Sequence, residues 1–357
     1  GIGGISMSGL AEILLEEGFT VSGSDAKESP LTKKLESEGA VIHYGQCAEN
    51  ITDDINCVVY TAAINKSNPE LMEAVGKKIP MLTRAELLGQ LMKNYDTPIA
   101  VSGTHGKTTT TSMISEVLLA ADMDPTISVG GILKTIGGNI RVGKSGNFIT
   151  EACEYTNSFL HFYPKISVIL NIEEDHLDFF KDLEDIRHSF HQFSALLPSD
   201  GTLIINGDIK DYQEIYEGLD CNVITYGSSA EFDYSATEIQ YDEKGFVSFE
   251  LLKHNTSCGR VQLSVTGDHN VSNALAAIAT AELLGIPMDT IRKGLLSFSG
   301  TDRRFEYKGT FNGVTVVDDY AHHPTELRAT LTTAKEMGYK RLIAVHQPFT
   351  YSRTKML

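Results

Sequence analysis

Long apolar segments are missing from this sequence, and their absence excludes one class of protein. No stretch reaches the roughly 18 consecutive apolar residues that a membrane-spanning helix needs, so we expect no membrane partner. The pattern of a secretory signal peptide is missing as well. Because the chain opens on Gly1 rather than on methionine, we expect its natural N-terminus to lie upstream.

Cysteine and positive charge are scarce. The five cysteines are scattered, odd in number and without a C-x-x-C pair, which is typical of buried thiols in a reducing, cytoplasmic setting. The formal net charge is −17, whereas nucleic-acid binding needs a basic face, so we expect no nucleic-acid partner. An anionic substrate must then be held by local groups such as glycine loops, a metal ion, lysine and arginine.

The most informative segment is 99–111, where an apolar run, a glycine loop and a helix-forming stretch follow one another. Gly103 and Gly106 let backbone amides approach an anion, and the helix behind them points its positive end at the same place. Lys107 adds a full charge, and the Thr108 hydroxyl is a candidate Mg²⁺ ligand. The segment predicts a site for the phosphates of ATP or GTP, although Val101 replaces the first glycine of the usual phosphate loop. The alternative is a lysine merely solvated at a helix start.

A second glycine loop opens the chain. Residues 1–9 lead into a helix, and a strand at 20–25 then ends on Asp25, as at the start of a Rossmann unit. Ser6 stands where the third glycine is usual. Binding of a nucleotide diphosphate and a simple tight turn both remain open. The small residues 61–63 follow an expected strand at 57–60 and fit either ligand binding or close packing.

Helix and strand patterns alternate along the chain and predict the α/β fold class. We expect one small parallel sheet at the N-terminal end, followed by a linker at 96–98 because Pro98 would end the preceding helix. The phosphate loop then starts a second α/β unit, whose next strand is expected at 147–149. Segments 238–252 and 260–265 alternate in the manner of an antiparallel flap.

Acidic clusters follow two expected strands of this second unit. Glu154 follows the strand at 147–149 and His176 the strand at 166–171, so we expect both beyond adjacent strand ends at the edge of the phosphate loop. Glu154 is a candidate Mg²⁺ ligand. His176 would be an unusual one because Mg²⁺ prefers oxygen, and it could instead orient a metal-bound water or contact substrate. Three neighbouring acids are expected to be merely solvated: Glu151, Glu173 and Glu174.

Polar residues gather again after position 300. Arg303 and Arg304 could reach phosphate across a cleft or form a simple surface pair. A polar turn with four candidate functional residues follows an apolar strand, namely Asp319, Tyr320, His322 and His323. A helix at 325–337 and a strand at 341–346 come next, and Arg353 occupies the same kind of position one strand later.

Taken together, these motifs resemble the Mur ligase family of peptidoglycan synthesis. The matching stretches cover the whole chain in the family's order: 1–9, 101–111, 151–160, 171–178, 268–277, 303–306, 318–326 and 347–355. The resemblance implies a Rossmann-like UDP-sugar-binding domain at 1–97, a central P-loop ATPase-like domain that binds ATP at 98–300, and the start of a Rossmann-like C-terminal domain at 301–357. The family's third domain continues for roughly a hundred residues more, a typical domain length, so we expect a truncated C-terminal domain here.

The resemblance also implies residue roles. The catalytic residues would be Lys107, Glu154, His176 and Arg304. The ATP site would comprise Gly103, Thr104, His105, Gly106, Lys107, Thr108, Thr109, Asn270, Asn273, Arg304 and Asp319. The UDP-sugar would be held by Gly1, Gly3, Gly4, Ser6, Ser8, Asp25 and Thr61, and Mg²⁺ by Thr108, Glu154 and His176.

The implied reaction joins a carboxylate to an amine through an acyl phosphate, with ATP and Mg²⁺ as cofactors. The double histidine at 322–323 and His105 favour the branch that joins L-alanine to UDP-N-acetylmuramate, because siblings often have asparagine in place of His105. Phe349 and Thr350 stand where many relatives have His-Arg, so that loop is not assumed to select the amino acid. The alternatives are a sibling ligase that adds a tripeptide or another amino acid, and a non-catalytic nucleotide-binding protein.

Overall fold

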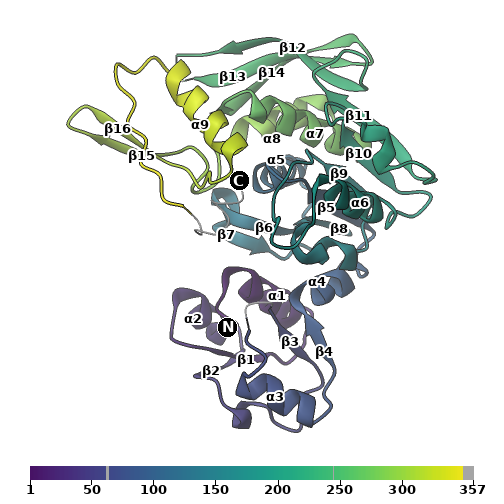
Figure 1. The fold of residues 1–357 in the computed structure, drawn as a ribbon, viewed down its shortest axis with the longest axis vertical. Helices are drawn as coiled ribbons and strands as arrows, with labels where there is room; N and C mark the ends of the chain where they lie inside the picture. Colours follow the sequence, from purple (N-terminus) through teal and green to yellow (C-terminus); the bar gives the residue numbers. More distant parts are fainter. Residues whose placement is uncertain (62–63, 244, 349–357) are drawn as a thin grey trace.

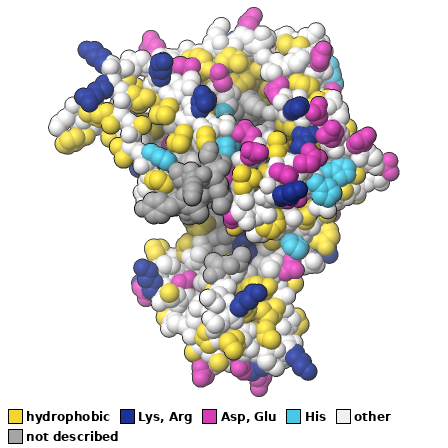
Figure 2. Space-filling view, in the orientation of Figure 1, with side chains coloured by type: hydrophobic (Ala, Val, Ile, Leu, Met, Phe, Trp, Pro, Cys, Tyr) yellow, Lys and Arg dark blue, Asp and Glu magenta, His cyan; other side chains and the backbone are white. Residues whose placement is uncertain are grey.

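The computed structural model describes residues 1–61, 64–243 and 245–348 of the chain. Helices and strands alternate as expected, and the α/β fold class is confirmed (Figure 1). An N-terminal body joins a larger central body through a narrow waist, which the space-filling view also shows (Figure 2). A C-terminal helix lies beside the central body, and a C-terminal hairpin extends away from it (Figure 1). Within the described ranges, every helix is too short or too polar to cross a bilayer.

The N-terminal body contains two parallel strand pairs. β1 (Ser22–Asp25) pairs with β2 (Val41–Tyr44), and β3 (Val58–Tyr60) pairs with β4 (Met81–Thr83). The expectation of one small sheet is therefore wrong for the described residues, where the two pairs stay separate. Four helices accompany these strands: α1 (Ile5–Glu16), α2 (Pro30–Ser37), α3 (Pro69–Gly76) and α4 (Arg84–Met92).

A ten-stranded sheet forms the central body, in the order β14-β13-β12-β11-β10-β9-β5-β8-β6-β7. Neighbouring strands run parallel from β12 to β6, while β12, β13 and β14 form an antiparallel end and β7 runs antiparallel to β6. The strands are β5 (Thr97–Ser102), β6 (Thr126–Leu133), β7 (Gly138–Arg141), β8 (Asn147–Glu151), β9 (Ile166–Ile169), β10 (Thr202–Asn206), β11 (Asn222–Gly227), β12 (Tyr234–Tyr241), β13 (Phe246–Lys253) and β14 (Thr256–Thr266).

Several sequence-based expectations about strands are wrong. Pro98 is the second residue of β5, and its carbonyl accepts the Lys165 N–H at 2.8 Å, so 96–98 is not a free linker. β6 and β7 come before β8, so 147–149 is not the first strand after the phosphate loop. Segments 238–252 and 260–265 are antiparallel as expected, within β12, β13 and β14, but these strands extend the central sheet through the parallel pair β11–β12 and do not form a separate flap. Residues 341–346 form no strand, and Val345 is 94% exposed.

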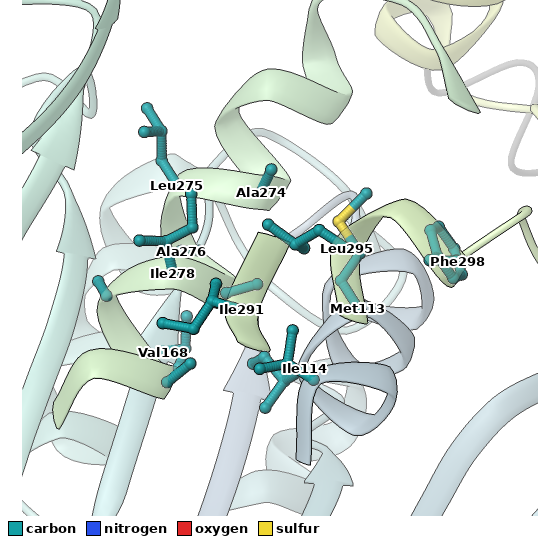
Figure 3. Packing of buried hydrophobic residues seen from close by; sticks show 14 of the residues in the cluster. Met113, Ile114, Val168, Ala274, Leu275, Ala276, Ile278, Ile291, Leu295 and Phe298 are labelled. Atoms are coloured by element: carbon teal, nitrogen blue, oxygen red, sulfur yellow. The ribbon is translucent and has the colours of Figure 1, made fainter. Parts of the chain in front are cut away.

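Both faces of the central sheet are buried, because alternate residues of its strands join different apolar clusters. Val168 belongs to one cluster and Ile169 to the other. On the first face, three helices pack together: α5 (Lys107–Ala120), α7 (His269–Leu283) and α8 (Met288–Ser297). Figure 3 shows Met113 and Ile114 of α5 facing Leu295 of α8. The second face is covered by α4 and α6 (Leu183–Ser194).

Helix α5 is fixed by this packing, which matters because it begins at the phosphate loop. A Cβ on Gly294 of α8 would lie 2.6 Å from the Cα of Val117, so glycine lets the two helices approach closely. The C-terminal part consists of the hairpin β15 (Glu306–Phe311) and β16 (Val314–Asp318), followed by α9 (Pro324–Glu336).

Candidate active site

The phosphate loop connects β5 to α5, as the sequence predicts. Gly103 has φ +146° and Gly106 has φ +82°, values that L side chains rarely adopt. A Cβ on Gly103 would also lie 2.9 Å from the Cβ of Leu170, and a Cβ on Gly106 would lie 2.7 Å from Oδ1 of Asn273. Both positions therefore require glycine for conformation and for space.

The segment after β9 supports the loop from one side. The His105 N–H donates to Oδ1 of Asn171 at 2.7 Å, and the Asn171 side-chain amide donates back to the His105 carbonyl at 3.1 Å. The Thr104 N–H donates to the Asn171 carbonyl at 3.2 Å. Intrahelical bonding of α5 starts with the Thr110 N–H, so the amides of its first turn remain the donors for a phosphate group. Asn171 is a supporting residue that sequence reasoning missed.

Lys107 and Glu154 meet at the carboxyl edge of the sheet. The Lys107 Nζ lies 2.9 Å from Oε2 of Glu154 and also donates to the carbonyls of Gly103 and Thr104. The side chains are only 16% and 3% exposed. Burial alone would lower the pKa of the Lys107 amine, but the charge of Glu154 outweighs it, and the pKa is raised. Lys107 is therefore a fixed cation behind the loop.

Glu151 lies beside this pair and is not the solvated acid that we expected. Its carboxylate accepts the Gly130 N–H, and the Thr108 hydroxyl hydrogen-bonds to it. Burial raises the pKa of the Glu151 carboxyl, while these hydrogen bonds and the charges of Lys107 and Arg304 oppose the rise. The expectation failed because β6, which carries Gly130 next to β8, was not predicted.

The oxygen atoms gathered here suit Mg²⁺. Glu154, Glu151 and Thr108 offer two carboxylates and a hydroxyl, and Mg²⁺ takes hard oxygen ligands. The Glu154 side chain is buried, a state that a carboxylate reaches only with a cationic partner or strong hydrogen bonds. The donor set therefore fits the metal that the family resemblance implies.

His176 is close to the same carboxylate. Its Nε2 lies 3.9 Å from Oε1 of Glu154 and 3.8 Å from Oδ2 of Asp175, and its ring stacks on Tyr155 with centroids 4.4 Å apart. Its φ of +54° is strained for a non-glycine residue. β8 and β9 flank β5 on opposite sides, so the two residues do not follow adjacent strands as expected. They still reach the same edge because all three strands are parallel.

A cavity of about 1400 Å³ opens next to the loop and receives side chains from distant segments. Asn270 and Asn273 lie in the first two turns of α7, where Asn273 donates to Oδ1 of Asn270 at 3.0 Å and accepts from the Thr110 hydroxyl at 3.2 Å. The lining includes seven of the residues assigned to ATP by resemblance, namely His105, Gly106, Thr109, Asn270, Asn273, Arg304 and Asp319.

The C-terminal part closes the far side of this cavity. Asp319 is held by the Phe305 N–H at 2.9 Å and by the Thr330 hydroxyl at 3.1 Å. Arg304 Nη1 lies 3.6 Å from Oε1 of Glu326. Its guanidinium carbon lies 5.8 Å from the centre of the Tyr320 ring. The arginine is thus placed over the cavity rather than in a simple surface pair.

Contacts between the phosphate loop and α9 also overturn the solvated role expected for Glu173. Its Oε2 accepts the Thr325 hydroxyl at 2.7 Å and lies 3.5 Å from Nε2 of His105. Nδ1 of His105 lies 3.2 Å from Oε1 of Glu326. These two carboxylates raise the pKa of His105 to about 9, against the effect of burial. Glu174, by contrast, is exposed as expected.

The N-terminal glycine loop is organised by Asp25 at the end of β1. The Gly3 N–H donates to Oδ2 of Asp25 at 2.9 Å, and a Cβ on Gly1 would lie 2.3 Å from the same oxygen. Gly4 precedes α1 as its N-cap residue. Ser8 is buried and donates to the Ile5 carbonyl, so its placement gives no support for ligand contact. Thr61 is half-buried directly after β3.

Arg84 is a second residue that sequence reasoning missed. Its Nη1 donates to the Ser6 hydroxyl at 3.0 Å, and its charge acts on Cys153, next to Glu154. Burial lowers the pKa of this guanidinium. Arg84 is the first residue of α4, where a positive charge is unfavourable next to the positive end of the helix dipole. This unfavourable position is the feature of the sequence that could have pointed to a role for Arg84.

Several residues named in the sequence-based predictions lie outside the described residues. These are Ala62 and Ala63 after β3, and Phe349, Thr350 and Arg353 at the C-terminal end.

A glycine loop between a parallel strand and a helix, with lysine at the first helical position and carboxylates from both neighbouring strands, defines a phosphate-loop nucleotide-binding α/β protein. Comparison with known families narrows this class. The description "Mur ligase family, catalytic domain" matches residues 1–96, "Mur ligase middle domain" residues 101–281, and "Mur ligase, glutamate ligase domain" residues 303–356. The chain belongs to the Mur ligase family.

Individual relatives of known name agree with this family assignment. The UDP-N-acetylmuramate–L-alanine ligase of Agathobacter rectalis is 62% identical over 355 residues, which are 99% of this chain and 77% of the relative. The enzyme of the same name from Clostridium perfringens is 53% identical over 357 residues, or 100% and 78% of the two chains. The crystal structure of the Thermotoga maritima UDP-N-acetylmuramate-alanine ligase matches with a TM-score of 0.81 at 30% identity, covering 94% of this chain and 76% of that one.

A second solved structure represents a sibling activity. The UDP-N-acetylmuramate:L-alanyl-gamma-D-glutamyl-meso-diaminopimelate ligase from Neisseria meningitides matches with a TM-score of 0.77 at 30% identity. The match covers 85% of this chain and 98% of that one.

Proposed function

We propose that this protein joins L-alanine to the lactyl carboxylate of UDP-N-acetylmuramate in an ATP-dependent reaction, as a step of peptidoglycan precursor synthesis. The observation that carries the proposal is the 2.9 Å contact between Lys107 and Glu154 at the phosphate loop. It is supported by relatives at 53–62% identity that bear this activity in their names. Cytoplasmic location is part of the proposal, supported by five free cysteines, of which Cys47 and Cys57 are exposed and not buried as expected.

We assign a different binding role to each of three successive parts of the chain. Residues 1–97 would bind the UDP-sugar through the loop that Asp25 organises, with Arg84 hydrogen-bonded to Ser6 of this loop. Residues 98–300 would bind ATP, with the triphosphate on the first turn of α5 and the adenosine in the cavity near Asn270. Residues 301–357 would cover the nucleotide with Arg304 and Asp319.

The chemistry requires two anions to meet, since the substrate carboxylate attacks the γ-phosphate. One close like-charge contact costs about 1 kcal/mol in water but about 4 kcal/mol at an effective dielectric constant near 20. Lys107 and Arg304 are the cations that the chain provides against this repulsion. Mg²⁺, held by Glu154 and Thr108 with His176 beside them, would neutralise further phosphate charge.

The second step joins the amine of alanine to the activated acyl group. The acyl phosphate is attacked by the neutral α-amino group, and phosphate leaves. Water would destroy the acyl phosphate, so the contacts between α9 and the phosphate loop serve to exclude solvent during the reaction.

Phosphate release tests the proposal directly. We expect release from ATP only when UDP-N-acetylmuramate and L-alanine are both present. The tripeptide L-alanyl-γ-D-glutamyl-meso-diaminopimelate, offered in place of alanine, separates this activity from the sibling one. Release with the tripeptide and none with alanine would overturn the proposal in favour of the sibling ligase. Binding of ATP without turnover under any substrate combination would favour a non-catalytic nucleotide-binding protein.

A further inference from the structure

Two histidines and a glutamate from three distant segments converge where α9 meets the phosphate loop. They are His105 of the loop, Glu173 after β9, and His323 at the N-cap of α9. One ligand atom from each lies within 4.8 Å of the others. The His105 and His323 ring centroids are 4.5 Å apart. Glu154 and Thr108, which the proposed function assigns to Mg²⁺, are not members of this cluster.

His105 is oriented as a metal ligand would be. Its Nδ1 faces Oε1 of Glu326 at 3.2 Å, an arrangement in which a carboxylate fixes the ring through one nitrogen and leaves the other for a metal. Its Nε2 is buried, and its partner among the described residues is Oε2 of Glu173, at an ion-pair distance of 3.5 Å. Two ligand atoms that each lie about 2.0–2.1 Å from a tetrahedral metal ion are about 3.4 Å apart. The distance between Nε2 of His105 and Oε2 of Glu173 therefore already suits a shared metal ion.

His323 is oriented in the same manner. Its Nε2 lies 3.1 Å from the Glu174 carbonyl oxygen, which fixes the proton on that nitrogen. Its Nδ1 then carries a lone pair and accepts a long hydrogen bond, of 3.3 Å, from the Thr325 N–H. His323 as a whole is 6% exposed, so little solvent would compete for this nitrogen.

We propose that His105, Glu173 and His323 form a second metal site, which takes a borderline transition-metal cation of the Zn²⁺ class rather than Mg²⁺. Two imidazole nitrogens and one carboxylate are a donor set that Zn²⁺ accepts and Mg²⁺ does not favour. The carboxylates of Glu173 and Glu326 that stabilise a protonated His105 would stabilise the divalent cation in its place, with release of the His105 proton.

The consequence is a clamp between two parts of the chain. His105 and Glu173 belong to the central body, whereas His323 belongs to the C-terminal part. A metal bound to all three would hold α9 on the phosphate loop and oppose the opening that nucleotide exchange requires. Zn²⁺ would therefore act as an inhibitor that Mg²⁺ does not displace.

The test is direct metal binding by the purified, chelator-treated protein in the presence of excess Mg²⁺. Zn²⁺ affinity is measured by competition with a chromophoric chelator, and Co²⁺ reports tetrahedral coordination through its visible absorption. We expect one Zn²⁺ per chain, with affinity about 10-fold or more weaker in Glu173→Gln and in His323→Asn. Asparagine is a good N-cap residue, so His323→Asn removes the imidazole while keeping the start of α9.

Two matched controls make the result specific. His322→Asn makes the same change one residue away, and Glu154→Gln removes the proposed Mg²⁺ ligand, so both should keep the wild-type Zn²⁺ affinity within about twofold. Wild-type affinity in Glu173→Gln and His323→Asn, loss of the ion in Glu154→Gln, or no saturable binding would each overturn the proposal. Binding is measured without catalysis, so these outcomes leave the proposed ligase function untouched.

Discussion

The Nζ of Lys107 lies 2.9 Å from Oε2 of Glu154, although 47 residues separate them in the chain. The strand order β9-β5-β8 produces this contact, because it brings the ends of three parallel strands to one edge. The contact makes a buried charge pair beside the first turn of α5. The Lys107 ammonium is suited to bind the anionic triphosphate. The Glu154 carboxylate is suited to bind the metal ion that accompanies the triphosphate.

Replacing Lys107 by alanine should abolish turnover while the protein stays folded. The loss in kcat should be at least about 100-fold, the scale found when one preorganised charge-stabilising group is removed from an active site. Phosphate release gives the rate, and circular dichroism checks the fold. Lys165→Ala, which breaks a partly exposed pair with Asp200, is the matched control and should keep normal activity. A folded Lys107→Ala protein with near-normal phosphate release would contradict the role of Lys107.

Replacing Glu154 by glutamine should weaken the dependence on Mg²⁺. The substitution keeps the shape of the side chain but removes the charge that would hold the ion, so half-maximal activity should require about 10-fold more Mg²⁺. A magnesium titration of phosphate release measures this. Glu174→Gln, at an exposed acid near the same edge, should leave the titration unchanged. An unaltered titration in Glu154→Gln would remove Glu154 from the metal site.

The pair formed by His105 and Glu326 should make stability depend on pH. The pKa of His105 is raised from 6.5 to about 9, so the folded state binds the proton more tightly than the unfolded state. The stabilisation is therefore complete below about pH 6.5 and is lost as the pH rises through about 9, with a size on the order of 3 kcal/mol at most. The pKa of Glu326 is lowered, so its contribution is lost only in acid.

Thermal unfolding of metal-free protein measures this effect against His105→Gln. The wild type should melt at a higher temperature at pH 6.5, and the difference should shrink towards pH 10. A difference that stays constant over this range would show that protonation of His105 contributes nothing to the contact.

Arg84→Ala should weaken use of the sugar nucleotide and leave ATP affinity intact. Its guanidinium holds the Ser6 hydroxyl in the N-terminal glycine loop, at a distance from the cavity that contains Asn270. We expect kcat/KM for UDP-N-acetylmuramate to fall about 10-fold, the cost of one charge-assisted hydrogen bond. Lys93→Ala, whose ammonium lies over the Tyr163 ring, is a control cation from just beyond the same helix. An ATP KM that rises as much as the sugar KM would contradict the assignment.

The sequence was sufficient to locate the elements with strong local signals. The glycine loop at 103–106 lies between β5 and α5 as predicted, and α8 runs from Met288 to Ser297 as predicted. Glycine and helix-forming residues act through their own backbone preferences, so these features could be recognised without the rest of the fold. The α/β class followed from the same alternation.

The remaining features depend on partners far away in the sequence. Glu151 looks like a surface acid until β6 brings the Gly130 N–H to it. His105 looks like a loop residue until Glu326, 221 residues later, pairs with it. The apolar pattern at 341–346 predicts a strand, but a strand also needs a neighbour, and none of the described strands pairs with it. Pairings of this kind are set by tertiary structure, which local patterns do not encode.

The most direct test of the account is the release of phosphate from ATP by the wild type and by Lys107→Ala, with UDP-N-acetylmuramate and L-alanine added singly and together. We expect release only by the wild type, and only with both substrates present. Release that Lys107→Ala retains, or that proceeds without either substrate, would contradict it.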